Sequence, residues 1–375
     1  MKRTNRVALL ACAAIASLAF AGSALASFAP KLVVSATSSG AARIGVVVGN
    51  SDDPTFRALF YVPNGYQVST PAPGANLGSV TATASAADLG GALLPLTGQL
   101  LAADPNAFTA SQKQSAAACL QGATQSQTWD LHLTAAGQTL DVPVFVLPVT
   151  AQEAASGYQA KLQICLPPPD VPASNPARAT FGAKLLSATF SSSAITAPAT
   201  AADYRWTSLW TPYTPTVGQP NAAGSVEVQG LRHVPTAIKL TVTKKKVTVT
   251  KKIKGKKHTI VHTLVKFSSA VTDGTGAAAS SVITTTAGGK KVGGASGSFT
   301  LASGKSAAVK VTAVVDSDTG SIPTGQTANP LVDLFYHDLG ASACTPSAIF
   351  GGLPCTDATV GGERLTAATT VKGFK

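Results

Sequence analysis

The stretch TVTKKKVTVTKKIKGKKHTIVHTLVKF (residues 241–267) determines how the rest of the chain is interpreted. Valine and threonine alternate with lysine on both sides of Gly255, which is the pattern of two β-strands joined by a tight turn. Residues 239–266 contain ten lysines, no arginine and no aromatic residue. Exposed lysines protect the edge of a sheet from pairing with another chain. The stretch therefore predicts a solvated β-hairpin whose lysines point into water.

The apolar residues of the first predicted strand do not all lie on one face. They are Ile238, Leu240 and Val242 before the lysine triplet, and Val247, Val249 and Ile253 after it. Because successive side chains of a strand point to opposite faces, the apolar face changes at Lys244–Lys246. We predict a bulge, a bend or a strand switch at this triplet.

The positive charge of the chain is concentrated around this hairpin. The formal net charge is +12, while residues 232–310 hold 15 basic residues against one acid, Asp273, which gives 15 − 1 = +14. Nucleic-acid-binding arms usually add arginine or aromatic rings, so nucleic acid is not the expected partner. Two hypotheses remain: the lysines only keep the hairpin soluble, or they attract anionic cell-envelope polymers or glycans. The polyanion patch would consist of Lys251, Lys252, Lys254, Lys256 and Lys257.

The N-terminus predicts export. Residues 1–26 begin with basic residues, continue with an apolar run and end in Ala24-Leu25-Ala26, which is typical of a cleaved signal peptide. No later segment reaches the roughly 18 consecutive apolar residues of a transmembrane helix. We expect a protein that is secreted or associated with the cell envelope, without a transmembrane anchor after signal cleavage.

The cysteine count also suits an exported chain. One of the five cysteines, Cys12, lies in the predicted leader, and four remain: Cys119, Cys165, Cys344 and Cys355. An even number predicts disulfides, and pairing of nearest neighbours, Cys119 with Cys165 and Cys344 with Cys355, keeps each bridge within one region. No CxxC motif accompanies them, and His258 and His262 are too far apart along a strand to share a metal, so no metal site is predicted.

Short runs rich in valine and threonine, broken by glycine, proline and asparagine, predict an all-β protein. Strands are expected at 31–37, 43–49, 57–62, 79–85, 128–134, 140–149, 160–166 and 184–191. In the strand TWDLHLT (128–134), Trp129, Leu131 and Leu133 share one face, while Asp130 and His132 share the other. The following AAGQT (135–139) fits a hairpin turn, and residues 100–127 are expected to form a loop or a short helix held by Cys119.

The length allows two domains after the leader. We predict two Greek-key β-sandwiches, an N-terminal one at residues 27–232 and a C-terminal one at 233–375. The second would contain the lysine-rich hairpin and a disulfide-containing insertion near 320–362.

A family resemblance supports the second sandwich. VTDG at Val271–Gly274, a V-x-T hairpin strand from Val282 to Gly289 and GSFTL at Gly297–Leu301 resemble a bacterial immunoglobulin-like or carboxypeptidase-regulatory-like domain over residues 265–315. The resemblance implies an immunoglobulin-like fold and leaves the function open, since such domains serve as spacers, adhesins and binding units. The N-terminal region is similar to uncharacterised exported proteins of GC-rich bacteria.

No catalytic motif stands out in the sequence. There is no G-x-S-x-G elbow, Walker loop or dinucleotide fingerprint, so neither an enzymatic activity nor a cofactor is predicted. The leading hypothesis is a structural or adhesion role outside the cell. The alternative is a glycan-binding module in which Tyr204, Trp206 and Trp210 stack on sugar rings, while the competing interpretation of these aromatic residues is a buried core.

Overall fold

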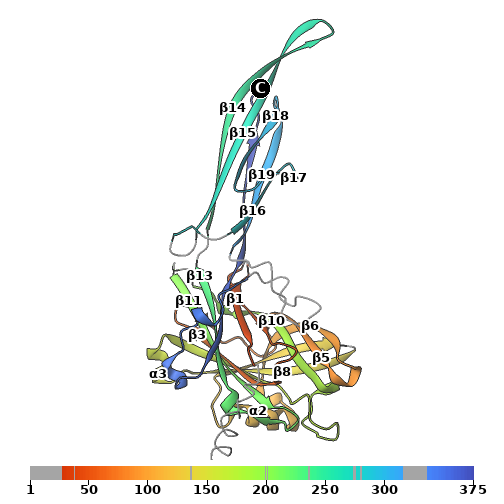
Figure 1. The fold of residues 1–375 in the computed structure, drawn as a ribbon, viewed down its shortest axis with the longest axis vertical. Helices are drawn as coiled ribbons and strands as arrows, with labels where there is room; N and C mark the ends of the chain where they lie inside the picture. Colours follow the sequence, from red (N-terminus) through yellow and green to blue (C-terminus); the bar gives the residue numbers. More distant parts are fainter. Residues whose placement is uncertain are drawn as a thin grey trace, which may run out of the picture.

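The computed structural model describes residues 28–37, 39–135, 137–198, 200, 202–234, 237–272, 276–278, 281–315 and 336–375. The described chain is mostly β-structure, arranged in a 15-stranded, a 3-stranded and a 4-stranded sheet. Figure 1 shows the large sheet at one end of the molecule and the two smaller sheets extending away from it. The all-β prediction is confirmed, whereas the predicted signal peptide at residues 1–26 lies outside the described residues.

The large sheet follows the order β1-β2-β10-β5-β6-β7-β8-β9-β3-β11-β13-β21-β20, with the short β4 and β12 attached to β10 and β11. Its pairs are antiparallel except for β13 and β21, which run parallel. The strands are β1 Lys31–Ala36, β2 Ala41–Val47, β3 Thr55–Pro63, β4 Gln67–Val68, β5 Asn76–Ala86, β6 Ala92–Ala103, β7 Gln127–Ala135, β8 Gln138–Leu147, β9 Tyr158–Cys165, β10 Ala183–Thr196, β11 Ala202–Thr214, β12 Gln219–Pro220, β13 Val226–Val234, β20 Tyr336–Asp338 and β21 Cys355–Gly361.

Two short helices flank this sheet, α2 (Ala110–Leu120) and α3 (Ala151–Ala155). Each begins with a capping box. The side chain of a threonine accepts a hydrogen bond from the backbone N–H three residues later, and the side chain of that later residue accepts one from the threonine's backbone N–H. The helix held by Cys119 is therefore confirmed. Strand β6 was not predicted, because Pro95 and Gly98 interrupt its pattern.

The large sheet curls until its two ends meet. Lys31 of β1 forms ion pairs with Asp338 of β20 and Asp357 of β21. Gly361 lies so near β1 that a Cβ there would overlap the Val34 carbonyl oxygen. The buried residues inside form one continuous core, whose largest members are Trp129, Trp206 and Trp210.

The second region consists of the two smaller sheets, in the orders β14-β15-β18 and β17-β16-β19-β22. Buried valine and leucine side chains of both sheets share cores, such as Val265 and Leu301 from one sheet with Val309 and Val371 from the other. The strands are β14 Ala237–Ile253, β15 Lys256–Thr272, β16 Ser281–Ala287, β17 Lys290–Gly293, β18 Ser296–Ala302, β19 Ser306–Val315 and β22 Glu363–Lys372.

The sheet topology bears on two predictions. The N-terminal region forms a single large sheet, so a pair of β-sandwiches is not confirmed. Residues 320–335 of the predicted insertion at 320–362 lie outside the described residues, and its strands β20 and β21 join the large sheet, whereas the following β22 pairs in the smaller sheets. The reason is the parallel pairing of β21 with β13, a long-range contact that no local pattern encodes.

Candidate functional site on the lysine-rich arm

The lysine-rich hairpin stands free of the rest of the molecule over much of its length. Strands β14 and β15 pair from Ala237 opposite Thr272 to Ile253 opposite Lys256. The third strand, β18, pairs with β15 only along His262–Ser268. Residues 245–261 are here called the arm; from Thr248, which lies opposite Val261, to the turn, the arm is a two-stranded ribbon without a third strand. Figure 1 shows this ribbon reaching beyond β18 and beyond the strands of the four-stranded sheet.

The base of the arm is fixed by its neighbours at the C-terminus. The Lys244 ammonium donates to the Lys372 carbonyl at 3.4 Å and lies 5.2 Å from the centre of the Phe374 ring. The Phe374 backbone N–H in turn donates to the Thr263 hydroxyl at 2.7 Å. The lysine triplet thus marks the boundary between the packed sheets and the arm.

The tip is a two-residue turn at Lys254 and Gly255, as the sequence predicted. Their φ angles are +49° and +80°. Positive φ at both central residues is the type I′ geometry, whose twist matches that of the two flanking strands. Glycine adopts it freely, and Lys254 is one of the few non-glycine residues of the described chain with positive φ.

All five lysines of the predicted polyanion patch lie at the tip and are exposed. The register places Lys252 directly opposite Lys257, Lys251 opposite His258 and Ile253 opposite Lys256. No acidic residue occurs between residues 237 and 272 to neutralise them. Because their charges add without local compensation, the tip has a strongly positive field.

Of the bulge, bend or strand switch predicted at the lysine triplet, the register excludes the bulge. The pairing of β14 with β15 runs without a register shift over its whole length. The apolar residues therefore change face on one regular ribbon. At the base, Leu240, Val242 and Val265 pack in the shared core. In the arm, Val261 stays on the face that is the core face at the base, whereas the other apolar residues occupy the opposite face, here called the apolar strip: Val247, Val249, Ile253 and Ile260.

The aromatic stripe on β11 does not provide a glycan-stacking surface. Trp206 and Trp210 are 0% and 1% exposed in the core of the large sheet. The Trp210 indole N–H donates to Ser208 Oγ at 2.8 Å, and its ring meets Phe60 edge to face. Tyr204 is half-buried against Tyr66. The stripe faces inward because this face of β11 lines the closed side of the curled sheet.

A cluster that the sequence analysis did not identify lies on the outer face of the large sheet. Asp130 and His132 of β7 and Asp141 of β8 each bring one ligand atom within 4.8 Å of the others. His132 lies opposite Asp141 in the register, and its Nδ1 is 2.7 Å from the Asp141 carboxylate. Two carboxylates and an imidazole can together coordinate a divalent transition metal.

The cluster has unusual protonation. Burial raises the pKa of Asp130 from 3.8 to about 7, and the charge of Asp141 and a hydrogen bond with it add to the rise, while His132 opposes it. This shift favours the protonated form of the Asp130 carboxyl up to nearly neutral pH. The predicted hairpin turn at 135–139 was the signal that could have located this cluster, because it sets His132 across from Asp141.

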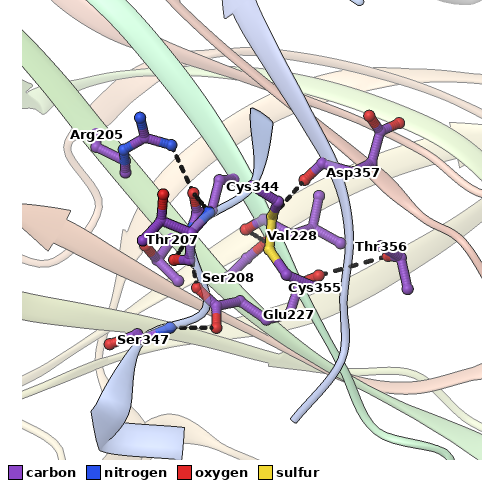
Figure 2. The surroundings of a disulfide bond; sticks show 12 residues. Arg205, Thr207, Ser208, Glu227, Val228, Cys344, Ser347, Cys355, Thr356 and Asp357 are labelled. Atoms are coloured by element: carbon purple, nitrogen blue, oxygen red, sulfur yellow. Dashed lines mark hydrogen bonds between the residues drawn. A yellow bond between two sulfur atoms is a disulfide. The ribbon is translucent and has the colours of Figure 1, made fainter. Parts of the chain in front are cut away.

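Both predicted disulfides are present, each with 5.8 Å between its Cα atoms. Figure 2 shows the surroundings of Cys344–Cys355, where the fully buried Glu227 accepts from the Ser347 backbone N–H at 2.8 Å. Burial raises the pKa of Glu227, opposed by Ser347, the Gln229 amide and Arg205. Gln229 also donates to the Thr345 carbonyl at 2.5 Å. These contacts attach the disulfide loop to the large sheet, so they serve the fold.

The remaining sequence candidates are not brought together into a site. His258 and His262 lie on β15, the first in the arm and the second beside β18, while His337 lies on β20. His233 contacts Asp203 at 2.5 Å on the large sheet.

No family model matches the chain, and neither the curated proteins nor the solved structures include a significant match. Within the described residues, no helix has both the length and the apolar character needed to cross a bilayer.

Proposed function

We propose that this chain is an exported, non-enzymatic β-protein that adheres to anionic material at the cell surface or outside the cell. The observation that carries the proposal is the arm, whose tip projects five exposed lysines with no acid nearby. Lysine is a strongly hydrated point charge, so the arm would attract polyanions with little selectivity. Anionic cell-envelope polymers and glycans fit that description, and nucleic acid does not, because the arm lacks arginine and aromatic rings.

Export is supported by two features. The N-terminal sequence has the pattern of a signal peptide. The two disulfides suit an oxidising compartment. An immunoglobulin-like architecture for the second region is supported by its two facing sheets of three and four strands with shared cores. In this arrangement the large sheet and the second region act as a support that holds the arm away from the rest of the molecule.

The test replaces Lys251, Lys252, Lys254, Lys256 and Lys257 with glutamine and measures retention on an anionic polymer column. The matched control removes five exposed lysines elsewhere in the second region: Lys266, Lys290, Lys291, Lys305 and Lys310. Both variants lose the same charge. We expect the arm variant to elute early while the control is retained, and retention of the native protein to fall between 0.1 M and 1 M salt, as the Debye length shrinks from about 10 Å to about 3 Å.

Equal retention of the arm variant and the native protein would contradict the proposal and leave the lysines as a solubility device. Early elution of both variants would mean that total charge, and not the arm, determines binding. A broad hydrolase screen that detects turnover, lost on changing one serine, aspartate or histidine, would contradict the non-enzymatic part.

A further inference from the structure

We infer that the arm binds the surface of an anionic lipid layer, with its apolar strip entering the layer and its lysines on the headgroups. The inference deepens the proposed function and rests on it, because the same arm supplies the charge. The observation behind the inference is the apolar strip, because attraction between lysines and a polyanion does not require apolar side chains on the arm.

Two of the four side chains of the strip, Val249 and Ile253, are exposed, and the other two, Val247 and Ile260, are partly buried. Val249 is 39% and Ile253 48% exposed, and both lie on the same face of the arm. Ile260 stands directly opposite Val249, so the two side chains form a cross-strand apolar pair. From Val247 to Ile253 the strip extends roughly 20 Å, at about 3.3 Å per residue. It reaches the last residue before the turn, so it includes the tip.

The opposite face of the arm is polar. Thr250 faces Thr259 and Lys252 faces Lys257, all exposed, with Thr248 beside Val261 below them. The arm is therefore an amphipathic ribbon. Its strip also lies on the opposite face from the residues that enter the core at the base, so it does not continue that core. Lys251 and His258 lie on the strip face between Val249 and Ile253, so the exposed apolar side chains there are interleaved with positive charge. Exposed apolar surface rimmed by polar residues marks interaction sites in proteins.

Charge decides between the possible occupants. Lys251 and Lys256 lie on the same face as the strip, and Lys252, Lys254 and Lys257 surround its end. A second copy of the arm would bring like charges together. A soluble polyanion would satisfy the lysines and leave the valine and isoleucine side chains in water. An anionic lipid surface satisfies both, because its charged headgroups lie directly above an apolar layer.

The experiment separates lipid binding from charge binding. The disulfide-intact protein is sedimented with vesicles of phosphatidylglycerol and phosphatidylcholine, or of phosphatidylcholine alone, and is run in parallel on a polyphosphate column. The test variant is Val249→Thr/Ile253→Thr. The matched control is Val217→Thr/Val282→Thr, which changes two exposed valines far from the tip, 57% and 61% exposed.

We expect the native protein and the control to bind the anionic vesicles, and the strip variant to bind them at least fivefold more weakly with unchanged polyphosphate retention. Vesicle binding by the strip variant equal to that of the native protein would overturn the lipid inference, as would a native protein that binds polyphosphate but not vesicles. The proposed function would stand in both cases. It fails separately if the native protein binds neither ligand.

A second measurement tests which face enters the lipid. In protein prepared without residues 1–26, which contain Cys12, the four bridged cysteines leave a single introduced thiol free for an environment-sensitive dye, at Ile253→Cys on the strip or Thr250→Cys on the polar face. We expect anionic vesicles to shift the emission of the dye at position 253 to shorter wavelength and to leave the dye at position 250 nearly unchanged. Equal shifts, or none at position 253, would overturn the inference.

Discussion

The large sheet and the arm both consist of strands with alternating apolar and polar residues, but they differ in whether one face of the strand is buried. In β7 of the large sheet, the side chains of Trp129, Leu131 and Leu133 are buried, while those of Asp130 and His132 between them are more exposed. In the arm neither face is buried, and the apolar residues move from one face to the other without a bulge. Burial of one face is what makes a change of face costly. Alternation predicts the inner face of a sheet only where a core exists to enforce it.

The same difference separates two sources of stability. The strands of the large sheet are held by a common core, whereas the arm has only its backbone pairing and its cross-strand contacts. An isolated two-stranded ribbon is marginally stable in water. We therefore expect substitutions in the large sheet to change the free energy of unfolding and substitutions in the arm to change mainly what it binds.

The largest effect should come from the core. Trp210→Ala removes a fully buried ring, its contact with Phe60 and its hydrogen bond to Ser208. We expect a loss of about 3–5 kcal/mol in the free energy of unfolding. Ile253→Ala in the arm should cost less than about 0.5 kcal/mol. Denaturant unfolding followed by the fluorescence of the other two tryptophans measures the large sheet directly, and comparable losses for the two variants would contradict the comparison.

The disulfides should rank next. Replacing Cys119 and Cys165 by serine opens a loop of 46 residues and releases α2 from β9. We expect a cost of about 4 kcal/mol from the entropy of the unfolded chain, against about 3 kcal/mol for the 11-residue separation of Cys344 and Cys355. Guanidinium unfolding of the two double variants gives the order. The reverse order would mean that contacts around Glu227, and not chain entropy, dominate.

The cluster on β7 and β8 should make stability depend on pH. The folded state keeps the proton of Asp130 up to about pH 7, whereas the unfolded chain releases it near 3.8. Between these values the folded state binds more protons, so stability falls as pH rises from about 4 to about 7. Asp130→Asn removes this fall. Its melting temperature relative to the native protein should therefore be higher at pH 8 than at pH 4.5, and a difference independent of pH would contradict the shifted pKa.

A divalent cation bound to the same cluster would replace the proton on the Asp130 carboxyl. We expect zinc or manganese to raise the melting temperature of the native protein at pH 8 and to leave Asp130→Asn and His132→Ala unchanged, if the three side chains coordinate it. An equal rise in all three proteins would place the bound cation elsewhere.

The smallest effect should come from the arm itself. Lys257→Glu turns the like-charged pair with Lys252 into an opposite-charged one. Cross-strand pairs of this kind contribute roughly 0.2–1 kcal/mol. Amide hydrogen exchange in residues 245–261 should slow modestly at low salt, and the gain should disappear at 1 M salt. Lys310→Glu, on β19, serves as the control and should leave exchange in the arm unchanged.

Local patterns determined much of this protein. Alternation located β7 and the hairpin strands, Gly255 located the turn, and nearest-neighbour spacing gave the disulfide pairs. These features depend on residues close together in the chain, and their backbone preferences are expressed wherever the segment lies. Strand β6 was not predicted, because a glycine such as Gly98 usually indicates the end of a strand. In the structure Gly98 is required within the strand, because the His132 carbonyl oxygen lies too close to leave room for a Cβ.

Only the tertiary structure decided the rest. Trp206 and Trp210 are core residues because the sheet curls around them, and β21 joins β13 across more than a hundred residues of intervening chain. The clustering of Asp130 with Asp141 requires the register of two strands, and the exposure of Val249 and Ile253 requires that the pairing of β15 with β18 stop at His262. In each case a side chain's environment is set by strands distant in sequence, because burial and charge depend on what lies across a sheet and not on what comes next along the chain.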